Sequence, residues 1–220
     1  VTFDNNNKVV PLLASSISAN TSGNVYTLNL RSNLKWHDGK PLTTADVLFT
    51  FRLIQNPDVN SPLRSYFDGV SVTSKGNSIV FTLPNPLASF PDYLNVGILP
   101  EHILGKVPVN ELRSASFNTQ TPIGSGPFVF KSLAVKGNDP SNAEVQINLA
   151  PFKDFVSDEP KLNAFIVHAY ASQTQLVNDL TSGKLNAAEG LSVVPEKISK
   201  DKKYKENNLI LTAGSYVFFR

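Results

Sequence analysis

The stretch from Tyr26 to Phe51 constrains the fold most, because it encodes a strand, a turn and a helix in one continuous run. Tyr26, Leu28 and Leu30 alternate with polar residues, which is typical of a half-buried strand. The sequence His37-Asp-Gly-Lys-Pro41 follows, and its residue types favour a tight turn. This part of the chain is therefore predicted to bend sharply after the strand.

A helix is predicted directly after that turn. Thr43 lies three residues before Asp46, the spacing of a capping box, in which each residue satisfies a backbone N–H of the first helical turn. Val47, Phe51 and Ile54 then recur at helical spacing. Trp36, the single tryptophan, is predicted to be a buried anchor beneath the turn instead of a platform for a ligand.

The composition is that of an ordinary globular protein. Of the 220 residues, 41% are hydrophobic and 17% are charged, which excludes wholesale disorder. A net charge of +2 does not favour a nucleic acid as partner, and the lysines between 197 and 205 alternate with acidic residues as on a solvated helix. The chain has no cysteine, and no window approaches the roughly 18 apolar residues of a membrane span.

The remaining pattern predicts a mixed α/β (α+β) fold. Hairpins are expected near the start of the chain and between Val70 and Leu83, two short helices between Leu87 and Lys106, and an irregular polar crossing over 107–121. After residue 122 the pattern predicts an antiparallel pair of strands over 128–149 and an apolar strand over 162–170. A helix from Ser172 to Gly183 and a strand over 185–191 would complete a βαβ-like unit. A helix opened by Pro195 and an apolar strand over 209–220 are predicted to follow.

Residues with possible chemistry are few. His37-Asp38 resembles a general base with an orienting carboxylate, but neighbours on a turn seldom face each other, and no Gly-x-Ser-x-Gly elbow is present. His102 and His168 lack the convergent ligands of a metal site, so we expect no metal, no cofactor and no catalytic residue. Gly124-Ser-Gly126 lacks the lysine of a phosphate-binding loop and is predicted to be a tight turn.

Several motifs together carry a family resemblance. They are LKWHDGKPLTTADVLFTF from Leu34, TPIGSGPF from Thr121, LTSGKLNAA from Leu180 and SYVFFR from Ser215. In this order they resemble the extracytoplasmic solute-binding proteins of peptide and nickel ABC importers, family 5, the oligopeptide- and dipeptide-binding group. The resemblance covers essentially the whole chain, and family members are more than twice as long.

The resemblance implies one lobe of a periplasmic-binding-protein-like fold with an additional peripheral α/β domain. Residues 1–122 would form the peripheral domain, and residues 123–220 most of the main lobe. The second lobe would be missing, so we expect an excised piece of a longer protein, truncated at both ends, whose signal or lipid anchor has been removed. The glycine turn at 124–126 would lie where the chain returns to the main lobe, near the cleft.

Ligand-contact candidates follow from the same resemblance. Tyr216 and Phe218 lie on the terminal strand that would line the cleft, although alternate aromatics on a strand are more often core residues. Asn186 and Glu189 lie on the other segment expected to end at the cleft. The residues that select the solute would lie largely in the missing lobe.

The resemblance implies a receptor that captures an oligopeptide or similar solute outside the membrane and delivers it to an ABC permease, without enzymatic chemistry. Its location would be the periplasm or the outer face of the membrane through a lipid anchor, and we expect a monomer. Peptides, nickel complexes, haem and oligosaccharides are the solutes of the family. Two other classes remain open: a free-standing β-rich interaction module, and a hydrolase based on His37-Asp38.

Overall fold

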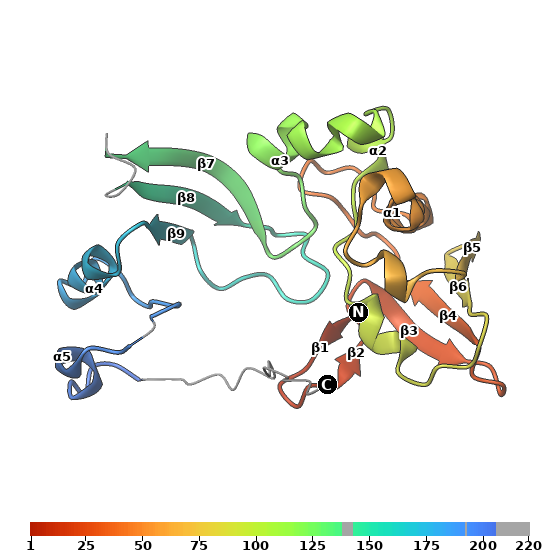
Figure 1. The fold of residues 1–220 in the computed structure, drawn as a ribbon, viewed down its shortest axis with the longest axis horizontal. Helices are drawn as coiled ribbons and strands as arrows, with labels where there is room; N and C mark the ends of the chain where they lie inside the picture. The colour runs from red at the N-terminus through yellow and green to blue at the C-terminus, as the bar shows by residue number, and fades with distance from the viewer. Residues whose placement is uncertain (138–142, 192, 206–220) are drawn as a thin grey trace, which may run out of the picture. The chain divides into compact units, whose positions relative to one another are not determined.

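Figure 1 shows the computed structural model, which describes residues 1–137, 143–191 and 193–205. The chain forms two compact units. The first comprises Val1–Ala134 and Ile147–Val167, and the second comprises the described residues of Val135–Gln146 and His168–Arg220. The predicted domain boundary near residue 122 stays a prediction, and the predicted strand over 209–220 lies outside the described residues.

The first unit is built on a four-stranded antiparallel sheet of order β3-β4-β6-β5 (Figure 1). Its strands are β3 (Ala14–Ala19), β4 (Val25–Leu30), β5 (Ser71–Lys75) and β6 (Ser78–Thr82). Leu28 pairs with Ile79, and Tyr26 pairs with Phe81, so buried side chains of both central strands share one face. The predicted strand at Tyr26 and the predicted hairpin between Val70 and Leu83 are both confirmed.

A small hairpin precedes this sheet. Strand β1 (Thr2–Phe3) pairs antiparallel with β2 (Val9–Val10), as the sequence predicts. Asn7 in the connecting turn has a φ of 58°, a left-handed conformation that asparagine tolerates better than most residues.

Helix α1 (Thr44–Gln55) covers the buried face of the sheet and begins with the predicted capping box. The Thr43 hydroxyl accepts a hydrogen bond from the Ala45 N–H, and the Asp46 carboxylate accepts one from the Thr43 N–H at 2.8 Å. Phe51 lies edge-on to Phe81 with ring centroids 4.9 Å apart, which places the helix on the aromatic core of the sheet.

Short helical turns connect the elements around this core. The two short helices predicted between Leu87 and Lys106 are confirmed as η3 (Phe90–Leu94) and α2 (Glu101–Leu104). Two further turns, η1 (Pro57–Val59) and η2 (Arg64–Tyr66), follow α1. The stretch predicted to be irregular over 107–121 instead contains η4 (Val109–Ser114) and α3 (Ser116–Thr119). That prediction was wrong because backbone hydrogen bonds, from Glu111 to the Pro108 carbonyl and from Gln120 to the Ser116 carbonyl, close short helical turns that polar composition does not reveal.

A second sheet has the order β7-β8-β9, with β7 (Phe128–Lys136), β8 (Glu144–Pro151) and β9 (Phe165–Tyr170) (Figure 1). The Phe152 N–H donates to the Pro127 carbonyl and the Ala171 N–H to the Ala143 carbonyl, so neighbouring strands run in opposite directions. This confirms the predicted antiparallel pair over 128–149 and the predicted strand over 162–170.

The second unit contains α4 (Gln173–Thr181) and the short α5 (Glu196–Ser199). Both helices are predicted by the sequence, and Gly183 closes α4 with a φ of 83° as expected. Val177, Leu180 and Ile198 form its small apolar core, to which Leu185 and Leu191 add partly buried side chains.

The strand predicted over 185–191 is not formed. Within the described part of the chain no strand pairs with this segment, and its residues form an open loop in which Gly190 has a φ of 80°. A strand requires a hydrogen-bonded neighbour, which local composition cannot supply, so this part of the predicted βαβ-like unit is absent from the described residues and the main-lobe assignment of 123–220 stays a prediction. No helix of the described residues has both the length and the apolar character that crossing a bilayer requires.

Candidate ligand-binding surface around the glycine turn

The turn after β4 folds tightly on itself before it meets any other segment. Lys35 and Pro41 form an isolated antiparallel bridge, and the Trp36 N–H donates to the Lys40 carbonyl. Gly39 has a φ of 84°, a conformation that favours glycine. The turn therefore presents the His37 side chain from a fixed backbone.

His37 binds the glycine turn of Gly124-Ser125-Gly126 through three hydrogen bonds. Its N–H donates to the Gly124 carbonyl at 2.8 Å. Its ring Nδ1 accepts from the Gly124 N–H at 3.2 Å, and Nε2 lies 2.9 Å from the Gly126 carbonyl. These partners assign a neutral imidazole with its proton on Nε2. A Cβ atom at Gly124 would lie 3.2 Å from His37 Cε1, so the ring also occupies the space where a side chain would stand.

Asp38 points to a different partner. Its carboxylate accepts a hydrogen bond from His102 Nε2 at 2.8 Å. Burial opposes ionisation of Asp38, but the hydrogen bonds from His102 and the Lys40 N–H prevail and hold its pKa below the usual value. Because both ring nitrogens of His37 bind the glycine turn, the base-and-carboxylate pair required by the hydrolase hypothesis is not formed.

Trp36 is fully buried beneath this turn, which confirms its predicted role as an anchor. Its ring lies edge-on to the His102 ring with centroids 6.2 Å apart. The indole N–H has no hydrogen-bond partner among the described residues. The Trp36 side chain therefore supports the turn by packing, while its backbone makes the hydrogen bond to Lys40.

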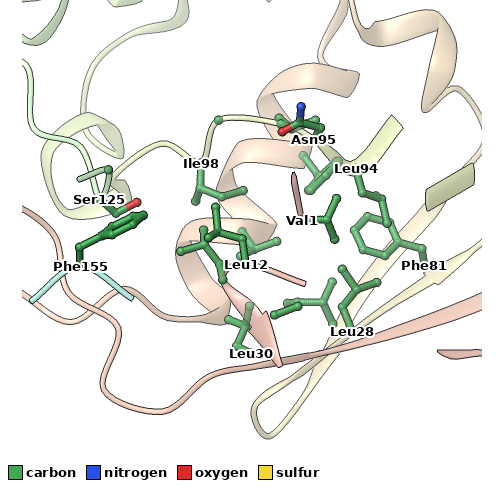
Figure 2. A pocket seen from close by; sticks show the side chains of 18 of the residues that line it. Val1, Leu12, Leu28, Leu30, Phe81, Leu94, Asn95, Ile98, Ser125 and Phe155 are labelled. Atoms are coloured by element: carbon green, nitrogen blue, oxygen red, sulfur yellow. The ribbon is translucent and has the colours of Figure 1, made fainter. Parts of the chain in front are cut away.

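A first hollow, with a volume of about 270 Å³, borders the glycine turn on its Ser125-Gly126 side. Figure 2 shows Ser125 and Phe155 on one side of it, and Leu94 and Phe81 on the other. Its lining is apolar apart from a few neutral polar groups: Val1, Leu12, Leu13, Ala14, Leu28, Leu30, Val47, Phe51, Ile79, Phe81, Leu94, Asn95, Val96, Gly97, Ile98, Ser125, Gly126, Pro127 and Phe155. Such a lining suits an apolar side chain with a neutral polar end.

A second hollow, about 460 Å³ in volume, borders the same turn at Gly124 and His37. It lies against apolar residues of the second sheet, among them Phe128 and Leu149. The complete lining comprises His37, Asn118, Gln120, Pro122, Gly124, Phe128, Phe130, Leu133, Ile147, Leu149 and Val167. The glycine turn thus contributes to both hollows, and its predicted place near the cleft stays a prediction.

The predicted ligand-contact residues are placed only in part. Asn186 and Glu189 are exposed on the loop that follows α4. Tyr216 and Phe218 lie outside the described residues. The structure therefore tests none of these four residues as ligand contacts, and they stay predictions.

The remaining histidines bind carboxylates. His102 contacts Asp38, and His168 Nδ1 lies 2.5 Å from Glu144 Oε1. No group of three or more histidine, cysteine, aspartate or glutamate side chains with metal-binding geometry occurs in the described ranges.

Sequence reasoning missed the contact between His37 and the glycine turn. The two segments are 87 residues apart, and each was interpreted as a separate turn. Both turns contain a glycine and a proline within two residues of each other, but such composition does not say which segments meet.

Comparisons with known proteins agree along most of the chain. The family model of bacterial extracellular solute-binding proteins, family 5 Middle, matches residues 8–219. Oligopeptide-binding protein AppA of Bacillus subtilis is 32% identical over 212 residues, which is 94% of this chain and 37% of the relative.

Two solved structures extend the similarity to the fold. AppA from Bacillus subtilis in complex with a nonapeptide matches with a TM-score of 0.73 and 31% identity, over 83% of this chain and 36% of that one. NikZ from Campylobacter jejuni in complex with Ni(L-His) matches with a TM-score of 0.72 and 30% identity, over 84% of this chain and 35% of that one. The chain thus spans little more than a third of these relatives' length. It belongs to the bacterial extracellular solute-binding proteins of family 5.

Proposed function

We propose that this chain is part of the solute-binding component of an ABC importer, which captures an oligopeptide or a similar small solute outside the membrane and delivers it to the permease. The observation that carries this proposal is the similarity to AppA, whose structure holds a nonapeptide and matches 83% of the chain. Membership of an extracellular family supports an extracytoplasmic location, in the periplasm or on a lipid anchor.

The geometry supports non-covalent binding. Both hollows beside the glycine turn are lined by neutral and apolar groups, which suit side chains of varied shape more than one charged head group. Asn186, Glu189, Tyr216 and Phe218 are proposed as further contacts. A second lobe would close over the solute, exclude water and complete the hydrogen bonds to its backbone.

A nickel complex is the second candidate solute, because NikZ was solved with Ni(L-His) and is 30% identical. The described residues contain no cluster of three metal-binding side chains, so they offer nothing that favours this solute over a peptide. An oligopeptide remains the preferred proposal on the similarity to AppA.

The test uses the complete gene product, purified from cells and titrated by calorimetry with nonapeptides of mixed sequence and, separately, with Ni(L-His). We expect a dissociation constant in the micromolar range or tighter for peptide, and native mass spectrometry should find peptides that co-purify with a monomer. Absence of binding to every nonapeptide would overturn the peptide proposal, and binding of Ni(L-His) alone would establish the second candidate.

The interaction-module hypothesis is tested with residues 1–220 by themselves. We expect this chain to bind nonapeptide at least about 100-fold more weakly than the complete protein, because one lobe supplies contacts from one side only. Equal affinity would show that the 220 residues suffice. Capture of a folded partner protein, with no peptide binding by the complete product, would favour the interaction module.

A further inference from the structure

Five ionisable side chains meet in the second unit. They come from β8, β9, α4 and the residue that follows its closing glycine: Glu144, His168, Tyr170, Asp179 and Lys184. None of them lines either hollow. The cluster is therefore a separate feature that needs its own physical explanation.

Glu144 is the centre of this cluster. It is only 5% exposed, and it accepts hydrogen bonds from His168 Nδ1 at 2.5 Å and from Lys184 Nζ at 3.0 Å. The bond from His168 is the main reason why the pKa of Glu144 lies below its usual value, although burial opposes this shift; Lys184 adds to it. A buried carboxylate is costly unless it is paired, so Glu144 constrains where both partners can lie.

Lys184 is held by a second carboxylate as well. Its Nζ lies 2.5 Å from Asp179 Oδ2, which also accepts the Tyr170 hydroxyl at 2.7 Å. Lys184 Nζ further lies 5.7 Å from the centre of the Tyr170 ring. The ammonium group thus has three partners on three different elements, which fixes its position more closely than one surface ion pair would.

The loop with Asn186 and Glu189 begins directly after this lysine. The backbone N–H groups of Lys184 and Leu185 both donate to the Asp179 carbonyl, at 3.0 and 3.2 Å. No hydrogen bond joins residues 186–191 to another described residue. Within the described chain, the loop is therefore held by Lys184 at its start and by the packing of Leu185 and Leu191.

We propose that Glu144 is a positioning residue for ligand binding: through Lys184 it fixes the start of the loop that presents Asn186 and Glu189 to the solute. This inference rests on the proposed function, in which those two residues contact the solute. A neutral side chain at 144 would remove the charge that holds Lys184 against β8. Lys184 would then keep only Asp179 and the Tyr170 ring as partners, and the loop would sample a wider range of positions.

Hydrogen exchange on the complete gene product tests the positioning without any solute. Glu144→Gln and, in case that variant fails to fold, Lys184→Met should each raise the exchange of the amides at 184 and 185, whose N–H groups are bonded to the Asp179 carbonyl at the start of the loop, by about tenfold or more. Amides of α4 around Val177 should keep their protection. The matched control is Glu196→Gln, which removes the charge of a glutamate whose ion-pair partner, Lys200 just after α5, has an exposed side chain.

Binding of a nonapeptide is the second measurement. Glu144→Gln should weaken it about tenfold or more, Lys184→Arg should retain most of the affinity, and Glu196→Gln should leave it unchanged. Equal loss of protection in α4 and the loop would overturn the inference, because Glu144 would then act on the stability of the whole unit. Faster loop exchange with unchanged affinity would overturn it too. If the unaltered protein binds no nonapeptide, the proposed function fails, while the exchange measurement still decides whether Glu144 positions the loop.

Discussion

At the scale of single residues, His37 shows how a motif that suggests catalysis can serve structure. An imidazole with both nitrogens bound to backbone groups has neither a free lone pair to accept a proton nor a free N–H to donate. Its three hydrogen bonds instead hold the glycine turn that borders both hollows. The position of that turn, and with it the shape of the candidate binding surface, therefore depends on His37.

Alanine substitutions in the glycine turn test this dependence. Gly124→Ala should lower the free energy of unfolding by about 1–3 kcal/mol, because the new Cβ would stand 3.2 Å from the His37 ring and force it to move. Gly126→Ala is the matched control, since nothing lies within 4 Å of a Cβ there, and its effect should stay within about 0.5 kcal/mol. Urea denaturation followed by Trp36 fluorescence measures both; equal effects of the two variants would contradict this role of His37.

The sequence could predict the environment of a residue only where the residues that it contacts lie close to it in the chain. Burial of Trp36 followed from its type and its place at a turn. The contact between His37 and Gly124 could not be predicted, because it joins positions 87 residues apart and each end has a sufficient local explanation as a turn. The two hollows were missed for the same reason, since their linings come from segments distant in sequence.

At the scale of secondary-structure elements, Asp46 links two helices. One carboxylate oxygen accepts the Thr43 N–H and completes the capping box of α1. The other accepts the Glu101 N–H at 2.9 Å, at the first residue of α2. Asp46 is only 4% exposed. If its carboxylate were removed, water could not easily replace it as the acceptor for the two N–H groups.

Substitutions at the start of α1 should therefore lower the free energy of unfolding by different amounts. Thr43→Ala removes one exposed cap and should lower the free energy of unfolding by about 1 kcal/mol. Asp46→Ala leaves two backbone donors without an acceptor and should cost about 2–5 kcal/mol. Thr44→Ala, one residue further along, serves as the control and should change little. Thermal unfolding of the three variants provides the comparison, and an Asp46→Ala variant no less stable than Thr43→Ala would refute the shared role.

The elements also show where sequence patterns stop being informative. The capping box, the hairpins and the glycine end of α4 were predicted because neighbours within a few residues determine them. The strand over 185–191 was predicted to complete a βαβ-like unit, yet Leu185 and Leu191 pack on the small core of the second unit without a partner strand among the described residues. Strand formation depends on a neighbour, which the segment itself does not encode.

At the scale of the whole molecule, the two units are stabilised by different means. The first has a large core in which Phe51, Phe67, Phe81 and Phe90 contact one another. Among the described residues, the second has three buried apolar side chains, Val177, Leu180 and Ile198, and the network around Glu144. Ionisation should therefore affect the second unit more than the first.

The pH dependence of the second unit follows from the direction of each pKa shift. The pKa values of Glu144 and Asp179 are lowered, mainly by hydrogen bonds from His168 and Lys184 respectively, so the folded state binds fewer protons. Their contribution to stability is present above the ordinary values of 4.5 and 3.8 and is lost as the pH falls below them.

Burial and the bond to Asp179 raise the pKa of Tyr170 to about 12, and Asp179 and Glu144 raise that of Lys184. The contribution of these two groups is present below their ordinary values of 10.0 and 10.5 and is lost as the pH rises above them.

Methyl NMR in a fixed concentration of urea can follow both units separately. The folded fraction reported by Leu180 should stay constant between about pH 5 and 10 and fall on either side, whereas that reported by Leu28 in the first unit should change less. Tyr170→Phe should reduce the fall of the folded fraction at Leu180 at alkaline pH, and Glu144→Gln should reduce its fall at acid pH. Coincident pH profiles for Leu180 and Leu28 would contradict the prediction, because they would mean that the two units unfold together and that each ionisation affects both cores alike.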